Sequence, residues 1–552
     1  MGNPFVIRKR VFFDKVDVFI FLFFVLTVID YDYNLSLAPV LLFTIISLGI
    51  AWFVCRLSIF LLPVLAKYVT FVILLCGLIE AVWGLGQLYD FFPSKHHVFN
   101  TTGSFFNSGP YGGFIALMFP LVLHCWITVR KENIILEYLF LAVGIVLLLV
   151  FPATLSRTAW LAAITGCLLV ILFDTNVIAT VKALRKRKPR KLLLITAIIT
   201  VLVLIGAYGV FHIKKDSANG RLFIWKISVL AIKESPVQGV GLGGFPAAYA
   251  KAQLNYFKNG KGTETEKLVA GSPEYAFNEY LRISIEQGLL GVVIFLLLTF
   301  LIIRSGIRNK QTGGAGSFLA LSVFAFASYP YYLWEFLVMW VVLGSVCVTK
   351  KGDAQHEKTN KRSVYFSISL LGLLLVGTIL CMKQLQPYRQ AKKEWEKIRP
   401  LHTVRAYQSA IDGYDRLYPT LNYDPKFVFE YAVTLNAQEQ REKADRVLTR
   451  GLQLSCDPMF FNVKGRNNHE MGKYKEAETC YIHSTYLLPE RIYPYYLLTK
   501  LYADSANYQP AKMRLAARAV LEKEPKVHST AINEMRDEVR KILKSKEVEN
   551  ER

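Results

Sequence analysis

The sequence predicts an all-α protein in which a polytopic transmembrane helix bundle is followed by an α-helical repeat domain. Three observations support this fold class. The 552 residues are 53% hydrophobic and only 19% charged, whereas soluble domains carry about 25% charged residues. The apolar residues are concentrated before about residue 382, and amphipathic helices with a repeat begin near Gln384. We therefore expect a membrane domain over residues 1–383 and a second domain over residues 384–552.

The membrane domain is expected to contain about eleven spans. A helix needs about 20 mainly apolar residues to cross the hydrocarbon core of a bilayer, which is about 30 Å thick. An odd number of spans places the two domain ends on opposite sides of the membrane. The apolar windows lie at about 15–30, 35–54, 66–88, 110–129, 135–152, 158–174, 192–211, 286–303, 316–332, 335–349 and 364–382.

A basic run between two of these windows predicts the orientation. Seven of the ten residues from Lys182 to Lys191 are Lys or Arg. Short basic loops translocate poorly and stay on the cytoplasmic side. The polar stretch at about 212–285 then becomes a large exterior loop, and residues 384–552 lie outside as well. Because topology accounts for this run, the net charge of +23 is not taken as a sign of nucleic-acid binding.

The C-terminal domain shows a regular spacing of small residues. Ala410, Ala444, Ala477 and Ala511 occupy similar frames, separated by 34, 33 and 34 positions. This period resembles tetratricopeptide repeats, in which paired helices cross at a small residue. Such a domain can present a concave surface to a protein partner or to part of a substrate. The alternative is a helical domain that only stabilises the membrane part.

The cysteines give little support for a metal site. Five of the eight cysteines lie in or beside apolar windows and Cys381 ends the last window, where small buried hydrophobic side chains are expected. No CxxC motif or Cys/His cluster is found, and we predict neither a metal nor a cofactor. Cys456 and Cys480 fall in the domain expected outside, where an oxidising compartment would allow a disulfide between them.

Two segments that lead into predicted spans contain candidate ligand-binding residues. The first, at 102–121, contains Gly109, Gly112 and Gly113, which permit close approach of a ligand or of a neighbouring helix. The second, at 154–166, places Arg157 at the exterior end of a span. Snorkelling to the interface would explain an arginine there, but the cytoplasmic loops already supply the charge that topology requires. Anion binding is the other explanation.

The third segment, at 219–245, reads as a helix that glycines interrupt. Arg221 and Trp225 lie near one face of this helix. The glycines at 239, 241 and 244 match the pattern GxGxxG. A dinucleotide site is rejected, because this pattern follows a helix rather than a strand and faces the exterior.

The fourth segment, at 274–295, predicts a polar helix that continues into a span. Glu274, Asn278, Arg282 and Glu286 are spaced by four residues, so they should align on one face of that helix. A polar stripe on a helix at the membrane is more often functional than incidental.

These four segments, in this order, resemble the O-antigen ligase family of membrane glycosyltransferases over roughly residues 100–300. The most specific pieces are SR before a span, GR-x3-W followed by P-x-x-GVGLG-x-F, and the segment that begins NEYL. The resemblance implies transfer of a glycan from an undecaprenyl-diphosphate-linked donor to an acceptor hydroxyl. The reaction would take place outside the bacterial inner membrane, without a metal, and the C-terminal domain would be periplasmic. The acceptor would be a lipid, a polysaccharide or a protein.

The resemblance also implies roles for individual residues. Arginines would hold the diphosphate, since bidentate guanidinium contacts neutralise a leaving phosphate group. The family usually has histidine just before the asparagine of the fourth motif, but this chain has Phe277. Glu274 or Glu279 could replace that histidine as general base. The expected diphosphate ligands are Arg157, Arg221 and Arg282, and the expected supporting residues are Asn107, Trp225, Gly241, Asn278, Tyr280 and Glu286.

Two kinds of alternative remain. The missing histidine leaves open a polysaccharide polymerase or a protein O-oligosaccharyltransferase of the same superfamily. A transporter of lipids or polysaccharides would also have many spans, but it predicts ionisable residues in mid-span. Apart from Glu80, the predicted spans are largely free of central charge. This distribution favours an enzyme that works at the membrane interface.

Overall fold

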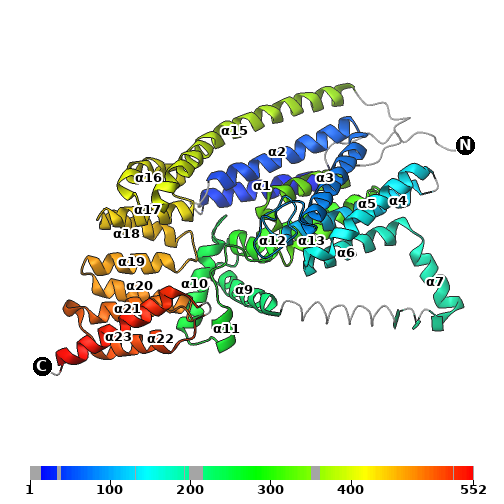
Figure 1. Ribbon diagram of the computed structural model, residues 1–552. Coiled ribbons are helices and arrows are strands. Elements are labelled where there is room, and N and C mark those ends of the chain that lie inside the picture. The colour runs from blue at the N-terminus through cyan, green and yellow to red at the C-terminus, as the bar shows by residue number, and fades with distance from the viewer. Residues whose placement is uncertain are drawn as a thin grey trace, which may run out of the picture.

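The computed structural model describes residues 14–33, 39–130, 132–191, 193–194, 196–197, 215–349, 361–525 and 528–550. Within these residues the chain forms helices and no strands, so the all-α prediction is confirmed for the described part. Figure 1 shows a bundle of long helices at one side and a row of shorter helices at the other. The helices α9, α10 and α11 lie between them.

Most bundle helices coincide with predicted spans. Six described helical segments are long and apolar enough to cross a membrane, namely Val40–Leu61, Leu65–Leu88, Ser108–Val129, Ile134–Thr154, Arg157–Asp174 and Glu279–Arg308. The helices α13 and α14 are apolar but shorter, and the expected span at 192–211 lies almost wholly outside the described residues. The count of eleven spans therefore stays a prediction. The bundle consists of α1 (Lys15–Tyr33), α2 (Pro39–Leu61), α3 (Leu65–Leu88), α4 (Ser108–Val129), α5 (Ile134–Val150), α6 (Arg157–Asp174), α12 (Glu279–Arg308), α13 (Thr312–Ala325) and α14 (Trp334–Val348).

The centre of the bundle is formed by α4, α6 and α13, which pack tightly on one another. Small residues make this possible. A Cβ added to Gly166 would lie 2.5 Å from the carbonyl oxygen of Gly316, so the backbones of α6 and α13 touch. Between membrane helices, where lipid is as apolar as the side chains, close contact of this kind is a main source of association.

The two ends of the bundle differ in character. At one end, α6 is followed by α7 (Val177–Arg187), whose last turn contains Arg185, Lys186 and Arg187. A buried ion pair between Arg56 and Asp17 (3.1 Å) connects α1 and α2 at this end. The starts of α4, α6 and α12 and the end of α13 lie at the opposite end. If the basic helix α7 is cytoplasmic, as the sequence predicts, this second end faces outward.

The loop region 215–278 contains α9 (Lys215–Glu234), α10 (Phe245–Lys258) and α11 (Glu264–Val269). It is joined to α12 by a glycine-dependent break. Gly288 lies inside α12 with φ +68°, and a Cβ there would come 1.9 Å from the carbonyl oxygen of Val237. The break leaves two carbonyls of α12 free for the glycine-rich turn, since Val240 N donates to Ile285 O and Gly241 N to Glu286 O, both at 2.9 Å. Gly241 therefore anchors the loop to α12.

The C-terminal part begins with one continuous helix, α15 (Lys361–Thr403), which contains both the last predicted span and the expected boundary at residue 383. Consecutive helices then pack on one another and form the row in Figure 1. They are α16 (Tyr407–Leu421), α17 (Pro425–Ala437), α18 (Arg441–Leu452), α19 (Met459–Glu470), α20 (Tyr474–Leu487), α21 (Tyr493–Ala503), α22 (Pro510–Glu522) and α23 (Thr530–Asn550).

The repeating alanines are only partly equivalent. Ala410, Ala444 and Ala477 are fully buried, as expected for residues at helix crossings, but Ala511 is exposed. In the last copy, Met513 takes the buried position on α22. The identification as tetratricopeptide repeats stays a prediction.

The C-terminal helices α16 to α23, called the repeat region here after the sequence prediction, pack against the loop region through α20 and α10, and their cysteines are not paired. The thiol of Cys456 donates to the carbonyl oxygen of Pro273 in the loop region, with the two atoms 3.2 Å apart. Cys480 is a second buried free thiol. The structure therefore has no disulfide between Cys456 and Cys480, because Cys456 is used at the contact with the loop region.

Candidate functional site

A small cavity lies at the end of the bundle opposite α7. Its volume is about 80 Å³, well below the roughly 300–1,000 Å³ of pockets that enclose whole small ligands. It therefore has room for a single small group and not for a sugar. Its walls come from segments that are far apart in the sequence, namely Asn107, Gly109 and Pro110 at the start of α4, Ser156 and Thr158 at the start of α6, Arg221 in α9, Phe277, and Phe324, Ala327, Ser328 and Tyr329 at and after the end of α13.

The start of α4 forms one wall. The side chain of Asn107 caps this helix by accepting from Gly109 N at 3.0 Å. A Cβ on Gly109 would make only an ordinary contact, 3.7 Å from Asn107 Oδ1, whereas a Cβ on Gly112 would crowd Thr154 and one on Gly113 would meet the ring of Phe324. Of the three glycines in this motif, Gly109 lines the cavity and the other two serve helix packing.

Arg221 is the cation of the cavity wall. It is half-buried, and its Nη1 donates to the carbonyl oxygen of Ala327 at 2.7 Å. Within the described residues no carboxylate forms an ion pair with it. Burial lowers the pKa of Arg221, the nearby charge of Arg157 lowers it further, and Tyr329 acts in the opposite direction. The guanidinium stays charged at neutral pH, because an arginine titrates far above it.

Arg157, the first residue of α6, lies close enough for its charge to act on Arg221. The two arginines come from different segments of the sequence, and the fold brings their charges to one end of the bundle. Two like charges repel one another, so this arrangement stores electrostatic energy that a bound anion would release. A phosphate-sized anion also fits the volume of the cavity.

Phe277 stands where the sequence led us to look for a base. Its backbone has φ +50°, a left-handed conformation that costs about 1–3 kcal/mol for a residue of this kind. The aromatic cluster of Tyr275, Tyr329 and Phe277 holds it there, since Tyr275 stacks on Tyr329 with centroids 4.4 Å apart and Tyr329 meets Phe277 edge to face at 5.3 Å. The strained residue thereby places its ring 5.1 Å from the guanidinium carbon of Arg221.

The predicted polar stripe at 274–286 is only partly helical. α12 begins at Glu279, and Asn278 is its cap, accepting from Tyr280 N and Leu281 N. Because Asn278 is extended and Phe277 is left-handed, Glu274 cannot lie on the same helix face. The expectation of one face from Glu274 to Glu286 was therefore wrong for its first two members.

Arg282 lies in a buried cluster with two carboxylates. Its Nε lies 2.6 Å from Glu279 Oε2, and its Nη1 lies 3.2 Å from Glu286 Oε2. Tyr332 covers the guanidinium at 4.7 Å, and Glu279 Oε1 accepts from Tyr331 N. The carboxylate side chains are only 1% and 2% exposed. The contact between Arg282 and Glu286 follows from their spacing of four residues on α12, and the cluster fastens α12 to the segment that follows α13.

The other expected residues lie around these two groups. Glu274 has a side chain that is 63% exposed and forms an ion pair with Lys426 of α17 at 3.8 Å. Trp225 packs edge to face on Phe326 at 5.4 Å. The hydroxyl of Tyr280 donates to Ser322 O at 2.8 Å. These contacts brace α9 and α12 against α13 and connect the loop region to the repeat region.

Ser156, Ser328 and Tyr329 line the cavity but were not predicted from the sequence. Tyr329 was hidden in the expected span 316–332, but α13 ends at Ala325 and a short 3-10 helix, Pro330–Tyr332, follows. A signal was present, because a residue before proline avoids the helical conformation. Burial raises the pKa of Tyr329 to about 12, so its hydroxyl stays protonated and can donate a hydrogen bond.

Comparisons with known proteins agree with this location. Residues 142–296 match the model of the O-antigen ligase family, a range that includes Arg157, Arg221 and the start of α12. The chain is 29% identical over 138 residues to a Rickettsia conorii protein named "Putative polysaccharide ligase" and 25% identical over 132 residues to one of the same name from Rickettsia felis. Each match covers 24% of this chain and 30% of the relative. Residues 142–296 of the chain are thus similar to an O-antigen ligase domain, and the two relatives that the chain matches are proteins named as polysaccharide ligases.

Proposed function

We propose that this protein is a membrane glycosyltransferase that needs no metal and moves a glycan from an undecaprenyl-diphosphate-linked donor to an acceptor hydroxyl. The observation that carries the proposal is Arg221, which lines a phosphate-sized cavity beside the charge of Arg157. Arg221 donates a hydrogen bond to the backbone carbonyl of Ala327, and no described carboxylate compensates its positive charge. The diphosphate of a lipid-linked donor supplies the missing negative charge.

The two arginines act on the leaving group. The acceptor oxygen forms a bond to the anomeric carbon while the bond from that carbon to the diphosphate oxygen breaks, and undecaprenyl diphosphate leaves with the electron pair. Negative charge grows on the departing oxygen during this step. Guanidinium groups already held in place stabilise that charge more strongly than water does, since they need not reorient during the reaction.

The reaction also requires that the acceptor hydroxyl lose its proton. Neither expected base faces the cavity, because Glu274 pairs with Lys426 and Glu279 is held by Arg282 and Tyr331. This arrangement favours a reaction in which diphosphate departure leads and the proton is lost late, to water or to the leaving group. A strong base is then unnecessary. Glu274 and Glu279 remain the side chains to test.

The structure gives less support to a transporter than to an enzyme. Glu80, the exception among the predicted spans, is already used, since its Oε2 accepts from Ser104 N at 3.0 Å in the segment before α4. Arg221, which no described carboxylate neutralises, lies instead at one end of the bundle. An enzyme acting at the interface fits that distribution.

The deciding experiment uses the purified full-length protein in lipid nanodiscs. Donor lipid is added together with a membrane extract, as acceptor source, from a strain that lacks the protein. The proposal predicts release of free undecaprenyl diphosphate and appearance of the glycan on an acceptor, with the metal chelator EDTA present. Donor lipid that crosses a vesicle bilayer intact, with no diphosphate released, would support the transporter instead.

A further inference from the structure

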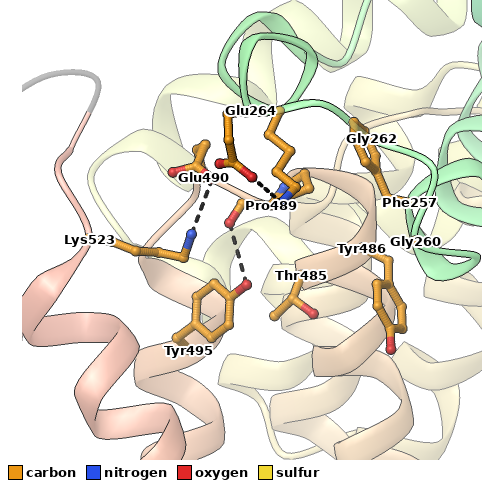
Figure 2. A pocket seen from close by; sticks show the side chains of 11 residues that line it. Phe257, Gly260, Gly262, Glu264, Thr485, Tyr486, Pro489, Glu490, Tyr495 and Lys523 are labelled. Atoms are coloured by element: carbon orange, nitrogen blue, oxygen red, sulfur yellow. Dashed lines mark hydrogen bonds and ion pairs between the residues drawn. The ribbon is translucent and has the colours of Figure 1, made fainter.

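A second and larger cavity lies outside the candidate site, where residues 257–267 face the helices α20 to α22. Its volume is about 300 Å³, the lower end of the roughly 300–1,000 Å³ found for sites of small ligands. Figure 2 shows the side chains around it, with Phe257 and Glu264 from the loop region and Tyr486, Glu490, Tyr495 and Lys523 from the repeat region or its connections.

The walls of this cavity are fixed to each other. The amide Nε2 of Gln253 in α10 donates both to Gly271 O at 3.1 Å and to Leu487 O at 2.6 Å, and this side chain is fully buried. Cys456 forms a further buried contact with the loop region. The cavity therefore exists before a ligand arrives, which reduces the cost of ordering its walls on binding.

The charges of the cavity are balanced. Lys523 Nζ lies 3.2 Å from Glu490 Oε1, and Lys267 Nζ lies 2.7 Å from Glu264 Oε1. Each lysine is already neutralised by a carboxylate, so the described lining offers no unpaired cation to a phosphate or an acidic lipid. The two pairs still offer acceptor oxygens and ammonium donors to a neutral ligand with many hydroxyl groups.

Aromatic rings supply the apolar part of the lining. Phe257, Tyr486 and Tyr495 all border the cavity, and Lys523 Nζ lies 5.5 Å from the centre of the Tyr495 ring. Gly260 has φ +70° and no atom within 4 Å of the place that a Cβ would take, which leaves that side open. Aromatic rings can pack on the C–H faces of a sugar, and the two ion pairs can form hydrogen bonds with its hydroxyl groups. The cavity therefore has a surface suited to a sugar.

We propose that this cavity is a subsite for a sugar unit of a neutral oligosaccharide, remote from the reacting linkage. The inference rests on the proposed function. The helix α10, with 14 residues, runs from the glycine-rich turn beside α12 to this cavity, a distance of about 20 Å at about 1.5 Å per residue. A glycan of several units whose phosphate linkage lies at the smaller cavity, with its sugars outside that cavity, can therefore extend along α10 toward the second cavity. The glycan belongs either to the donor or to the acceptor.

The first test measures binding of a free glycan. The probe is the glycan released from the donor lipid by mild acid, titrated calorimetrically into the full-length protein in detergent. Tyr486→Ala removes a ring and should weaken binding about two- to tenfold, since aromatic contacts contribute about 0.5–1.5 kcal/mol. Tyr486→Phe should bind like the parent. Glu490→Gln should weaken binding, while Glu522→Gln, which alters an exposed pair with Arg518, is the matched control.

The second test distinguishes the two sources of the glycan. If the donor glycan occupies the subsite, Tyr486→Ala should raise KM for the donor lipid, and shortening the donor glycan should remove the difference from the parent. If the acceptor occupies it, KM for the acceptor should rise instead. Remote contacts of this kind can also lower kcat when their binding energy is used in the transition state.

Failure of the inference can be told apart from failure of the proposed function. The subsite proposal would be overturned if the parent protein did not bind the released glycan. It would also be overturned if Tyr486→Ala and Glu490→Gln both had the affinity and the kinetics of the parent, and a protein partner would then become the better occupant. If the glycan binds and Tyr486→Ala weakens it, but no diphosphate is ever released, the subsite stands and the transferase assignment fails.

Discussion

Replacement of Arg221 is the most informative perturbation of the candidate site. A guanidinium has five N–H donors, and within the described residues Arg221 donates one hydrogen bond, to Ala327 O at 2.7 Å. The remaining donors are available to a diphosphate. Each charge-assisted hydrogen bond contributes about 1.5–3 kcal/mol, and about 1.36 kcal/mol changes a rate tenfold. Arg221→Ala should therefore lower kcat/KM by roughly ten- to a hundredfold.

Lysine at this position should recover little of the loss. It retains the positive charge but lacks the planar fork that binds two phosphate oxygens at once and also reaches Ala327. The assay is release of undecaprenyl diphosphate from the donor lipid, measured by mass spectrometry. Arg518→Ala is the control, because the Arg518 side chain is 72% exposed and pairs only with Glu522 among the described residues. This control should change neither rate nor stability.

A lower rate must be distinguished from a lower stability, because Arg221→Ala also removes a hydrogen bond between α9 and the segment after α13. The melting temperature of each variant in the same detergent makes this distinction. A variant with the melting temperature of the parent and a strongly reduced rate supports the diphosphate contact. Full activity in Arg221→Ala would refute the reasoning.

Four further predictions concern single features of the chain. Phe277→Leu removes the ring beside Arg221, worth about 0.5–2 kcal/mol, and should lower the transfer rate severalfold without unfolding the protein. Gly288→Ala should lower the melting temperature, since its Cβ meets a carbonyl oxygen at 1.9 Å and φ is +68°. The pH–rate profiles of Glu274→Gln and Glu279→Gln should keep the acidic limb of the parent if proton loss is late, and loss of that limb in either variant would identify a base. A reporter active only in the cytoplasm, fused after Arg552, should stay silent, and a signal would mean that a span has been miscounted.

The sequence was a good guide to the long helices of the bundle. The window 110–129 became Ser108–Val129, and 158–174 became Arg157–Asp174. These segments are set by the length of apolar chain that a bilayer requires, which is a local property. The window 316–332 failed at its end, because Tyr and Pro count as apolar although Pro330 disfavours a helical residue before it.

The sequence pointed to the charged residues of the candidate site but not to the contacts that they make across the fold. The motifs singled out Arg157 and Arg221, which the fold brings into electrostatic contact. The spacing of four residues also gave the contact between Arg282 and Glu286, since it lies within one helix. Contacts across the fold could not be read in this way. The ring of Phe277 on Arg221 depends on a strained backbone held by Tyr329, and the ion pair of Glu274 with Lys426 depends on docking of the repeat region.

The glycine-rich turn shows why a local pattern misleads. Its GxGxxG spacing belongs to dinucleotide sites only in a strand–turn–helix context. Here Gly239 and Gly241 have φ +74° and +88°, and the turn follows helix α9. A Cβ on Gly239 would lie 2.4 Å from Glu286 O. The glycines therefore allow the turn to dock on the break in α12.

The most direct test of the account is to locate the donor diphosphate. Cryo-electron microscopy of the unsubstituted protein in nanodiscs with donor lipid should show phosphate density at the cavity of about 80 Å³. Guanidinium nitrogens of Arg221 should lie about 2.7–2.9 Å from phosphate oxygens, the usual length of a charge-assisted bond. A diphosphate bound instead at the basic helix α7, at the opposite end of the bundle, would contradict both the site and the orientation proposed for it.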